Sequence, residues 1–237
     1  MRSPTSACNR VRIGWDEALR SPTSACKCWW DFSKPRPTIP WHRKKQSLST
    51  RSLPMSNYRR WYVPGGTYFF TVVTQERRPI LTTKLGRHCL RNAIHQVRVR
   101  YPFDMVAIVL LPDHFHTIWT LPEGDSRYST RLRRIKDKFT TAYLRCGGEE
   151  ALRSDSRVRT GERGIWQRRF WEHTIESEDD FENCFNYLHW NPVKHGLVKS
   201  VCEYRWSTFS KYVTAGIYDL TWGTGIVEPV LTGAEWD

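Results

Sequence analysis

The stretch "MVAIVLLPDHFHTIWTL", residues 105–121, contains a pair of strands around which the rest of the chain can be arranged. Its first seven residues form a continuous apolar run, which is typical of a central strand buried on both faces of a sheet. A proline and an aspartate then favour a turn, and the remaining residues predict a second strand. Because successive side chains of a strand point to opposite faces, His114 and His116 share one face. Two such imidazoles can hold a metal ion together, or they can be two structural histidines.

The segments on either side of this pair predict a regular order of elements. In chain order they are a strand at 67–73, a helix at 84–101, the two strands above, a helix at 129–144, a strand at 165–175 and a helix that begins at Ser177 and ends at Pro192. A polar, mobile loop is expected at 146–164. The first six elements match the split βαβ arrangement, a ferredoxin-like α+β fold whose antiparallel sheet carries helices on one face. Such a fold does not by itself specify a reaction.

The first 54 residues differ in character from the rest of the chain. The heptapeptide "RSPTSAC" occurs there twice, and a stretch rich in Pro, Ser and basic residues follows, which is typical of disorder. We interpret residues 1–54 as a disordered basic extension that precedes a true start at Met55; the alternative is a basic tail that binds nucleic acid. Residues 55–223 are expected to form the domain with a C-terminal tail, and residues 224–237 a flexible end.

Charge, hydropathy and cysteine content narrow the class of protein. The net charge is +13, but residues 1–54 hold 11 Lys and Arg against 3 Asp and Glu, so most of the excess lies in the extension. The sequence lacks both an 18-residue apolar run and a signal-peptide pattern, which predicts a cytoplasmic protein with no membrane association. Its seven cysteines are mostly isolated, and we interpret them as free thiols.

The predicted last helix carries a second group of polar residues. Asn183, Tyr187 and Asn191 recur every four residues, on a stripe separate from the apolar one. A helical tyrosine is commonly a packing residue whose hydroxyl is satisfied locally, and an asparagine before a proline commonly ends a helix. The residues alone therefore leave two interpretations open: a packed helix terminus, or part of an active site.

Four blocks of sequence, in order, carry a resemblance to a known family. They are "YRRWYVPGGTYFFTV", "LLPDHFHTIWTLPEGD", "IWQRRFWEHTI" and "YLHWNPVKHGLV". Together they resemble the REP-associated tyrosine transposases, members of the IS200-like, single-tyrosine group of the HUH nuclease superfamily. The resemblance covers roughly residues 56–223. It implies an HUH nuclease domain in which His114 and His116 bind a metal ion, Tyr187 is the catalytic nucleophile and Asn191 completes the metal site.

The resemblance also implies a reaction and a partner. The protein would be a bacterial, nucleoid-associated transposase and endonuclease that cleaves and rejoins single-stranded DNA at hairpins of repetitive extragenic palindromes. A 5′-phosphotyrosine intermediate conserves the energy of the broken bond. A phenol with a pKa of about 10 is a weak nucleophile at neutral pH, so a divalent cation, Mg²⁺ or Mn²⁺, is expected to assist; zinc would also bind such ligands.

Basic side chains are the expected contacts for the DNA backbone. The candidates lie in the family-like blocks or on a basic helix face: Arg59, Arg60, Arg168, Arg169, Arg131 and Arg134. For the helix face, a solvated surface is the alternative interpretation. The protein is expected to act as a monomer. Two other functions stay open, a catalytically silent protein that binds DNA hairpins and a replication initiator or relaxase of the same superfamily.

Overall fold

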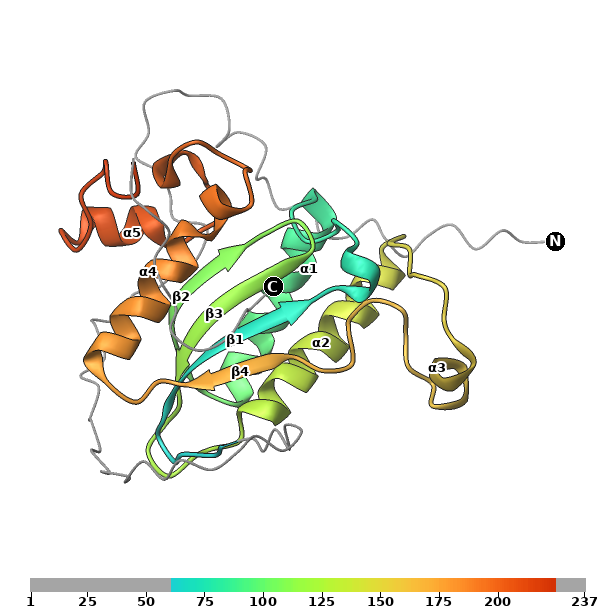
Figure 1. Cartoon of the computed structure of the whole chain (residues 1–237). Helices are drawn as coiled ribbons and strands as arrows, with labels where there is room; N and C mark the ends of the chain where they lie inside the picture. Colours follow the sequence, from blue (N-terminus) through green and yellow to red (C-terminus); the bar gives the residue numbers. More distant parts are fainter. Residues whose placement is uncertain (1–60, 225–237) are drawn as a thin grey trace, which may run out of the picture.

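The computed structural model describes residues 61–224, which form one sheet with helices on both of its faces (Figure 1). Its main elements are β1 (Thr67–Val73), α1 (Lys84–Arg100), β2 (Asp104–Leu110), β3 (His114–Thr120), α2 (Tyr128–Arg145), α3 (Asp155–Arg159), β4 (Trp171–Thr174), α4 (Glu178–Lys194) and α5 (Phe209–Thr214). Short 3₁₀ helices occur at Gln75–Arg77 and Val201–Glu203. The predicted extension at 1–54 and nearly all of the predicted C-terminal end lie outside the described residues. No helix within residues 61–224 has the length and apolar character needed to cross a bilayer.

The sheet has the strand order β2-β3-β1-β4, and every neighbouring pair is antiparallel. Helices α1 and α2 pack together behind it, as the ferredoxin-like arrangement requires. This confirms the predicted α+β class with its antiparallel sheet. Helix α4 follows β4 and lies on the other side of the sheet (Figure 1), so the sheet is covered on both faces.

The alternation of side chains along each strand divides the apolar interior into two cores. On β1, Tyr68 and Phe70 face α1 and α2, whereas Phe69 faces α4. On β3, Trp119 belongs to the first core and Ile118 to the second. The odd and even positions therefore serve different layers, and His114 and His116 share the α4 side with Ile118.

Strand β2 lies at the edge of the sheet, so the predicted central position of this apolar run is wrong. Its outer edge is covered by the chain that follows α4: the amide of Leu110 donates to the carbonyl of Trp206 at 2.8 Å, and the amide of Thr208 donates to the carbonyl of Ile108 at 2.9 Å. These bonds satisfy the edge that a terminal strand otherwise exposes. The run is apolar because both of its faces are buried. Burial of the faces does not determine whether a strand has one or two neighbouring strands.

The segment before β4 is less regular than the single strand predicted at 165–175. Only Trp171–Thr174 forms a strand, and Trp166 makes an isolated bridge to Thr74. The predicted loop at 146–164 contains helix α3, whose buried Arg157 donates to Oε1 of Gln75 at 2.6 Å and to the carbonyl of Arg163 at 3.0 Å. The bond to Gln75 ties this segment to a residue far away in the sequence, a contact that its polar sequence does not reveal.

Helix α4 begins as predicted and ends later than predicted. Ser177 caps it by accepting the amide of Asp180 at 3.1 Å, but the helix continues through Pro192 to Lys194. A proline near the end of a helix removes only one backbone bond, and the amide of His195 still donates to the carbonyl of Asn191 at 3.0 Å. The extra residues bring Lys194 and His195 to the site described next.

Candidate active site

His114 and His116 lie on β3 where its face meets α4, with their ring centroids 4.9 Å apart. They are 2% and 0% exposed. Nδ1 of His114 is 2.7 Å from Oδ1 of Asp113, and Nδ1 of His116 is 2.9 Å from Oγ1 of Thr71. Both Nε2 atoms are buried and have no hydrogen-bond partner among residues 61–224. Engaging Nδ1 in this way orients the ring and leaves Nε2 to act as a metal ligand.

Asn191 supplies the third group at this position. Its side chain is fully buried on α4, and neither its Oδ1 nor its Nδ2 has a hydrogen-bond partner within the described part of the chain. A buried polar group left unsatisfied costs about 1–3 kcal/mol, so several of them in one place require an explanation. Two imidazole nitrogens and an amide oxygen suit a divalent cation and leave positions for phosphate oxygens or water. The three residues therefore fit the ion that the sequence predicts.

The environment keeps His116 in the form that binds metal. Burial lowers its pKa well below the usual value for histidine, and the nearby His114 and His195 lower it further. The amide of Asn191 lies close enough to raise this pKa, although its geometry falls short of a hydrogen bond. A neutral imidazole has a lone pair on Nε2 that can coordinate a cation. Because the low pKa maintains that form at neutral pH, no proton has to be displaced when an ion binds.

Tyr187 lies one turn before Asn191 on α4 and faces the histidine pair. It is 2% exposed, and its ring centroid is 5.7 Å from that of His116 and 6.1 Å from that of Phe69. The ammonium of Lys194 donates to its hydroxyl at 3.3 Å. The candidate nucleophile therefore lies between the predicted metal ligands and the ammonium of Lys194.

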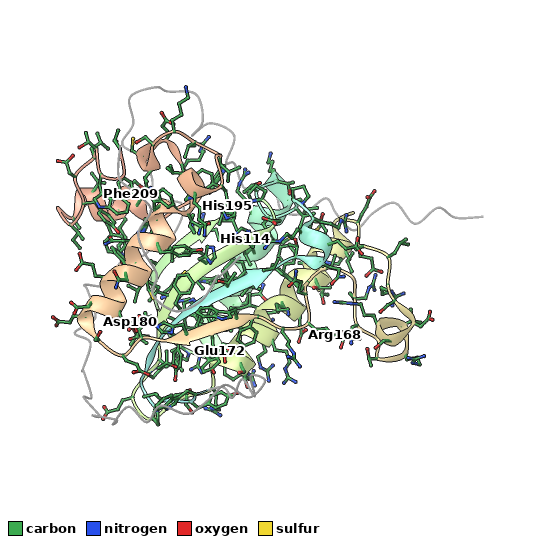
Figure 2. All side chains as sticks on the ribbon, viewed as in Figure 1. His114, Arg168, Glu172, Asp180, His195 and Phe209 are labelled. Atoms are coloured by element: carbon green, nitrogen blue, oxygen red, sulfur yellow. The ribbon has the colours of Figure 1, made fainter. Side chains whose placement is uncertain are left out.

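Two residues near the site were not predicted from the sequence. Lys194 contacts the Tyr187 hydroxyl, and the ring centroid of His195 is 5.1 Å from that of His114. Figure 2 shows His195 and His114 next to each other at one end of the sheet. Both follow Pro192 in "NPVKHG", and the expectation that the helix stops at this proline concealed them. Asn183, by contrast, is exposed and does not join the site.

The predicted arginines do not gather at Tyr187. Arg59 and Arg60 lie outside the described residues. Arg168 donates to Glu162 at 2.6 Å and lies towards α3, well separated from His114 in Figure 2. Arg169 is exposed, and the guanidinium of Arg134 lies 4.7 Å from the Tyr101 ring centroid, on the opposite side of the sheet.

Arg131 occupies a structural position on α2. It is 2% exposed and donates to Oδ2 of Asp125 at 2.8 Å, to the carbonyl of Pro102 at 2.8 Å and to that of Tyr101 at 3.3 Å. The basic pattern of α2 placed it on a DNA-binding face, but the pattern does not reveal that Asp125 folds back over it. A buried, fully engaged guanidinium is not available to a phosphate.

We therefore expect Arg131→Met to lower the free energy of unfolding by about 3 kcal/mol, because it removes the donor to a partly buried carboxylate and to three carbonyls. Urea denaturation measures this loss. Arg133→Met, at an exposed position of the same helix, is the matched control and should change stability by less than about 0.5 kcal/mol. Normal stability of Arg131→Met combined with weaker hairpin binding would instead support a surface role.

A basic groove of about 830 Å³ lies between α2 and the segment before β4. Its lining includes five cationic and two acidic residues: Arg133, Lys136, Arg157, Arg163, Arg168, Asp137 and Glu162. Lys136 also donates to the backbone carbonyl of Gln167 at 2.6 Å, which ties the two walls together. The groove brings Arg168 together with cations of α2 in a surface that suits a polyanion.

The fold and the site define a class: a ferredoxin-like domain in which a helical tyrosine faces a buried pair of strand histidines. Residues 62–191 match the family model described as "Transposase IS200 like". The chain belongs to this family.

Similar proteins agree with this assignment. The REP-associated tyrosine transposase of Escherichia coli K12 is 43% identical over 175 residues, which are 73% of this chain and 94% of that protein. A Haemophilus influenzae protein provisionally given the same name is 43% identical over 170 residues, 71% of this chain and 94% of its own length. A solved REP-associated tyrosine transposase bound to a REP hairpin is 41% identical, with a TM-score of 0.60, covering 76% of this chain and all of that one.

Proposed function

We propose that this protein cleaves and rejoins single-stranded DNA beside REP-type hairpins, with Tyr187 as the nucleophile. The observation that carries the proposal is the position of Tyr187 next to three buried residues, His114, His116 and Asn191, whose ligand atoms have no hydrogen-bond partner in the described chain. The relative that was solved with a REP hairpin supports the choice of substrate.

The reaction exchanges one phosphoester for another. Oη of Tyr187 attacks the phosphorus, the bond from phosphorus to the 3′ oxygen breaks, and the 5′ phosphate remains on the tyrosine. The 3′ oxygen leaves and takes up a proton, which gives a 3′ hydroxyl that can later reverse the step without ATP. Lys194, 3.3 Å from the phenol oxygen, stabilises negative charge there as the phenolic proton passes to water. His114, His116 and Asn191 would hold Mg²⁺ or Mn²⁺, which polarises the scissile phosphate when bound.

DNA contacts outside the active site would come from exposed cations. The exposed Arg133, Arg163 and Arg168 of the groove next to α2 are suited to phosphates of the hairpin stem, and the exposed Arg169 extends this surface. Arg134, whose guanidinium lies over the Tyr101 ring, is also on α2 and therefore on the same side of the sheet as this groove. Arg59 and Arg60 remain predictions, as do the monomeric state and the cytoplasmic location.

The test uses hairpin DNA from around the gene, labelled at either end, with the full chain and Mg²⁺ or Mn²⁺. The mechanism predicts a labelled protein band on a denaturing gel only with the 3′-labelled strand, because the 5′ phosphate of the downstream fragment stays on Tyr187. The 5′-labelled strand should release a shorter fragment that ends in a 3′ hydroxyl. EDTA should suppress both products. Retarded DNA on a native gel with no adduct would instead show a catalytically silent hairpin-binding protein.

A further inference from the structure

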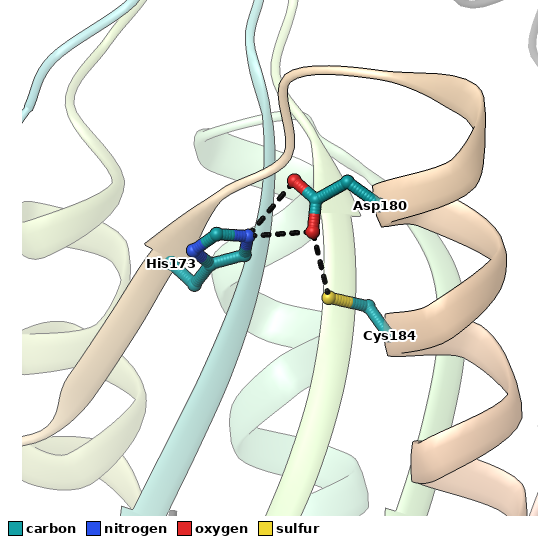
Figure 3. Close-up of side chains that lie close together, drawn as sticks. All are labelled: His173, Asp180 and Cys184. Carbon is teal, nitrogen blue, oxygen red and sulfur yellow. Dashed lines mark hydrogen bonds and ion pairs between the residues drawn. The ribbon is translucent and has the colours of Figure 1, made fainter. Parts of the chain in front are cut away.

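A second group of potential metal ligands lies at the other end of α4 (Figure 3). Nε2 of His173 is 2.8 Å and 2.9 Å from the two carboxylate oxygens of Asp180, and Sγ of Cys184 is 3.7 Å from Oδ1 of Asp180. The three ligand atoms lie within 4.8 Å of one another. Within residues 61–224, this is the one set of three His, Cys, Asp or Glu residues that converges so closely.

The fold brings these three side chains together for local reasons. His173 lies on β4 and points towards α4, opposite in direction to the neighbouring Glu172, which bonds to Tyr128 on the α2 side. Asp180 and Cys184 are four residues apart on α4, so they share one face of the helix. The second oxygen of Asp180 accepts the amide of Glu176 at 2.9 Å, which fixes the carboxylate at the start of the helix.

We propose that His173, Asp180 and Cys184 form a second cation site, selective for a zinc-like ion and distinct from the site beside Tyr187. An imidazole nitrogen, a carboxylate oxygen and a thiolate are the ligands that zinc prefers, and their spacing is compatible with tetrahedral coordination. The side chains of His173 and Asp180 are 32% and 27% exposed, so solvent reaches the site and can supply the remaining ligand. A sulfur ligand disfavours Mg²⁺.

Hydrogen bonding among the three side chains does not account for a cysteine at position 184. A thiol donates only weakly, and its 3.7 Å contact with Asp180 contributes little. Burial and the adjacent carboxylate raise the pKa of the Cys184 thiol. On binding, the S–H bond breaks, a metal–sulfur bond forms and the proton passes to solvent, with no change of oxidation state. A cation would replace this weak thiol contact with metal–ligand bonds to all three side chains.

The position of this site would allow a bound ion to hold helix α4 against the sheet. It joins the edge strand β4 to the first turns of α4, and Tyr187 lies only three residues after Cys184. A bound ion would fasten the helix that carries the proposed nucleophile to the sheet. The inference does not depend on the proposed reaction, because the ligands lie outside the set formed by His114, His116 and Asn191.

Cobalt titration of the reduced, chelator-treated full chain tests the proposal. The background is the double variant His114→Ala, His116→Ala, which removes the site beside Tyr187. Among the other cysteines, the close pair is controlled by Cys26→Ser with Cys28→Ser, because it could also bind the ion, and the exposed thiols by Cys146→Ser and Cys202→Ser. We expect one equivalent of Co²⁺ to give a thiolate charge-transfer absorption band that persists in these controls, disappears in Cys184→Ser and is displaced by Zn²⁺.

Thermal unfolding provides the second measurement. Zn²⁺ should raise the melting temperature of the histidine double variant but not that of the same protein with Cys184→Ser, whose circular dichroism verifies its folding. Asp180→Asn should weaken the response while it preserves the size of the side chain. A cobalt band that survives Cys184→Ser, or no band in the double variant, overturns the proposal. The proposed DNA cleavage is tested independently, by adduct formation of the wild-type protein with Mg²⁺.

Discussion

Tyr187→Phe is expected to abolish the covalent adduct between the protein and single-stranded hairpin DNA. The change removes one oxygen from a side chain that is 2% exposed, so the ring can keep its packing against Phe69 and His116. Without the hydroxyl there is no nucleophile to form the phosphotyrosine bond, and we expect the rate of cleavage to fall by about 10⁴-fold or more. Hairpin affinity, measured on native gels, should stay within about twofold, because the groove beside α2 is unchanged.

Tyr218→Phe is the matched control for this experiment. Tyr218 is also buried, and its hydroxyl donates to Oδ1 of Asn186 on the same helix at 2.8 Å. Its removal should cost about 1 kcal/mol of stability and leave adduct formation in place. An adduct that persists in Tyr187→Phe at the wild-type rate would remove Tyr187 from the proposed role, and equal loss in both variants would point to a general disturbance of α4.

The sequence predicted the order of elements well because each strand and helix has a local pattern. The apolar run at 106–111 shows that its strand is buried, and the structure confirms the burial. The pattern could not reveal that this strand lies at the edge, since the chain at Trp206 and Thr208 that covers it is almost a hundred residues away. Pairwise neighbours of strands are properties of the whole fold.

The candidate site shows the same division between local and long-range information. A two-residue spacing on a strand and a four-residue spacing on a helix place His114 with His116 and Tyr187 with Asn191. The meeting of the two pairs follows from α4 packing on the histidine side of the sheet. The basic pattern of α2 did not reveal that Arg131 is buried against Asp125, which lies in the turn before that helix. A sequence pattern predicts which face of a helix or strand a side chain lies on more reliably than it predicts the residues that surround that side chain.

Asn191→Leu is expected to stop metal-dependent cleavage and, in the absence of divalent cations, to stabilise the protein. Both polar atoms of Asn191 are buried without a hydrogen-bond partner in the described chain, and leucine has a similar size and favours helix. Removing the unsatisfied amide should therefore raise the free energy of unfolding in EDTA by about 1–2 kcal/mol. The adduct assay should show loss of product, because the third ligand is gone.

The effect of Mn²⁺ on the melting temperature distinguishes a metal ligand from a residue that only packs in the interior. Mn²⁺ should raise the melting temperature of the wild-type protein, since an ion that binds only the folded state stabilises it by mass action. The shift should be much smaller in Asn191→Leu and unchanged in Asn186→Leu, a control on the same helix whose side chain accepts a bond from Tyr218. An Asn191→Leu protein that is less stable in EDTA, yet keeps the full response to Mn²⁺, would show that Asn191 serves the packing of α4 and not the ion. The opposite signs expected for stability and activity follow from the proposed metal site, in which a bound cation would satisfy polar atoms that have no hydrogen-bond partner among the described residues.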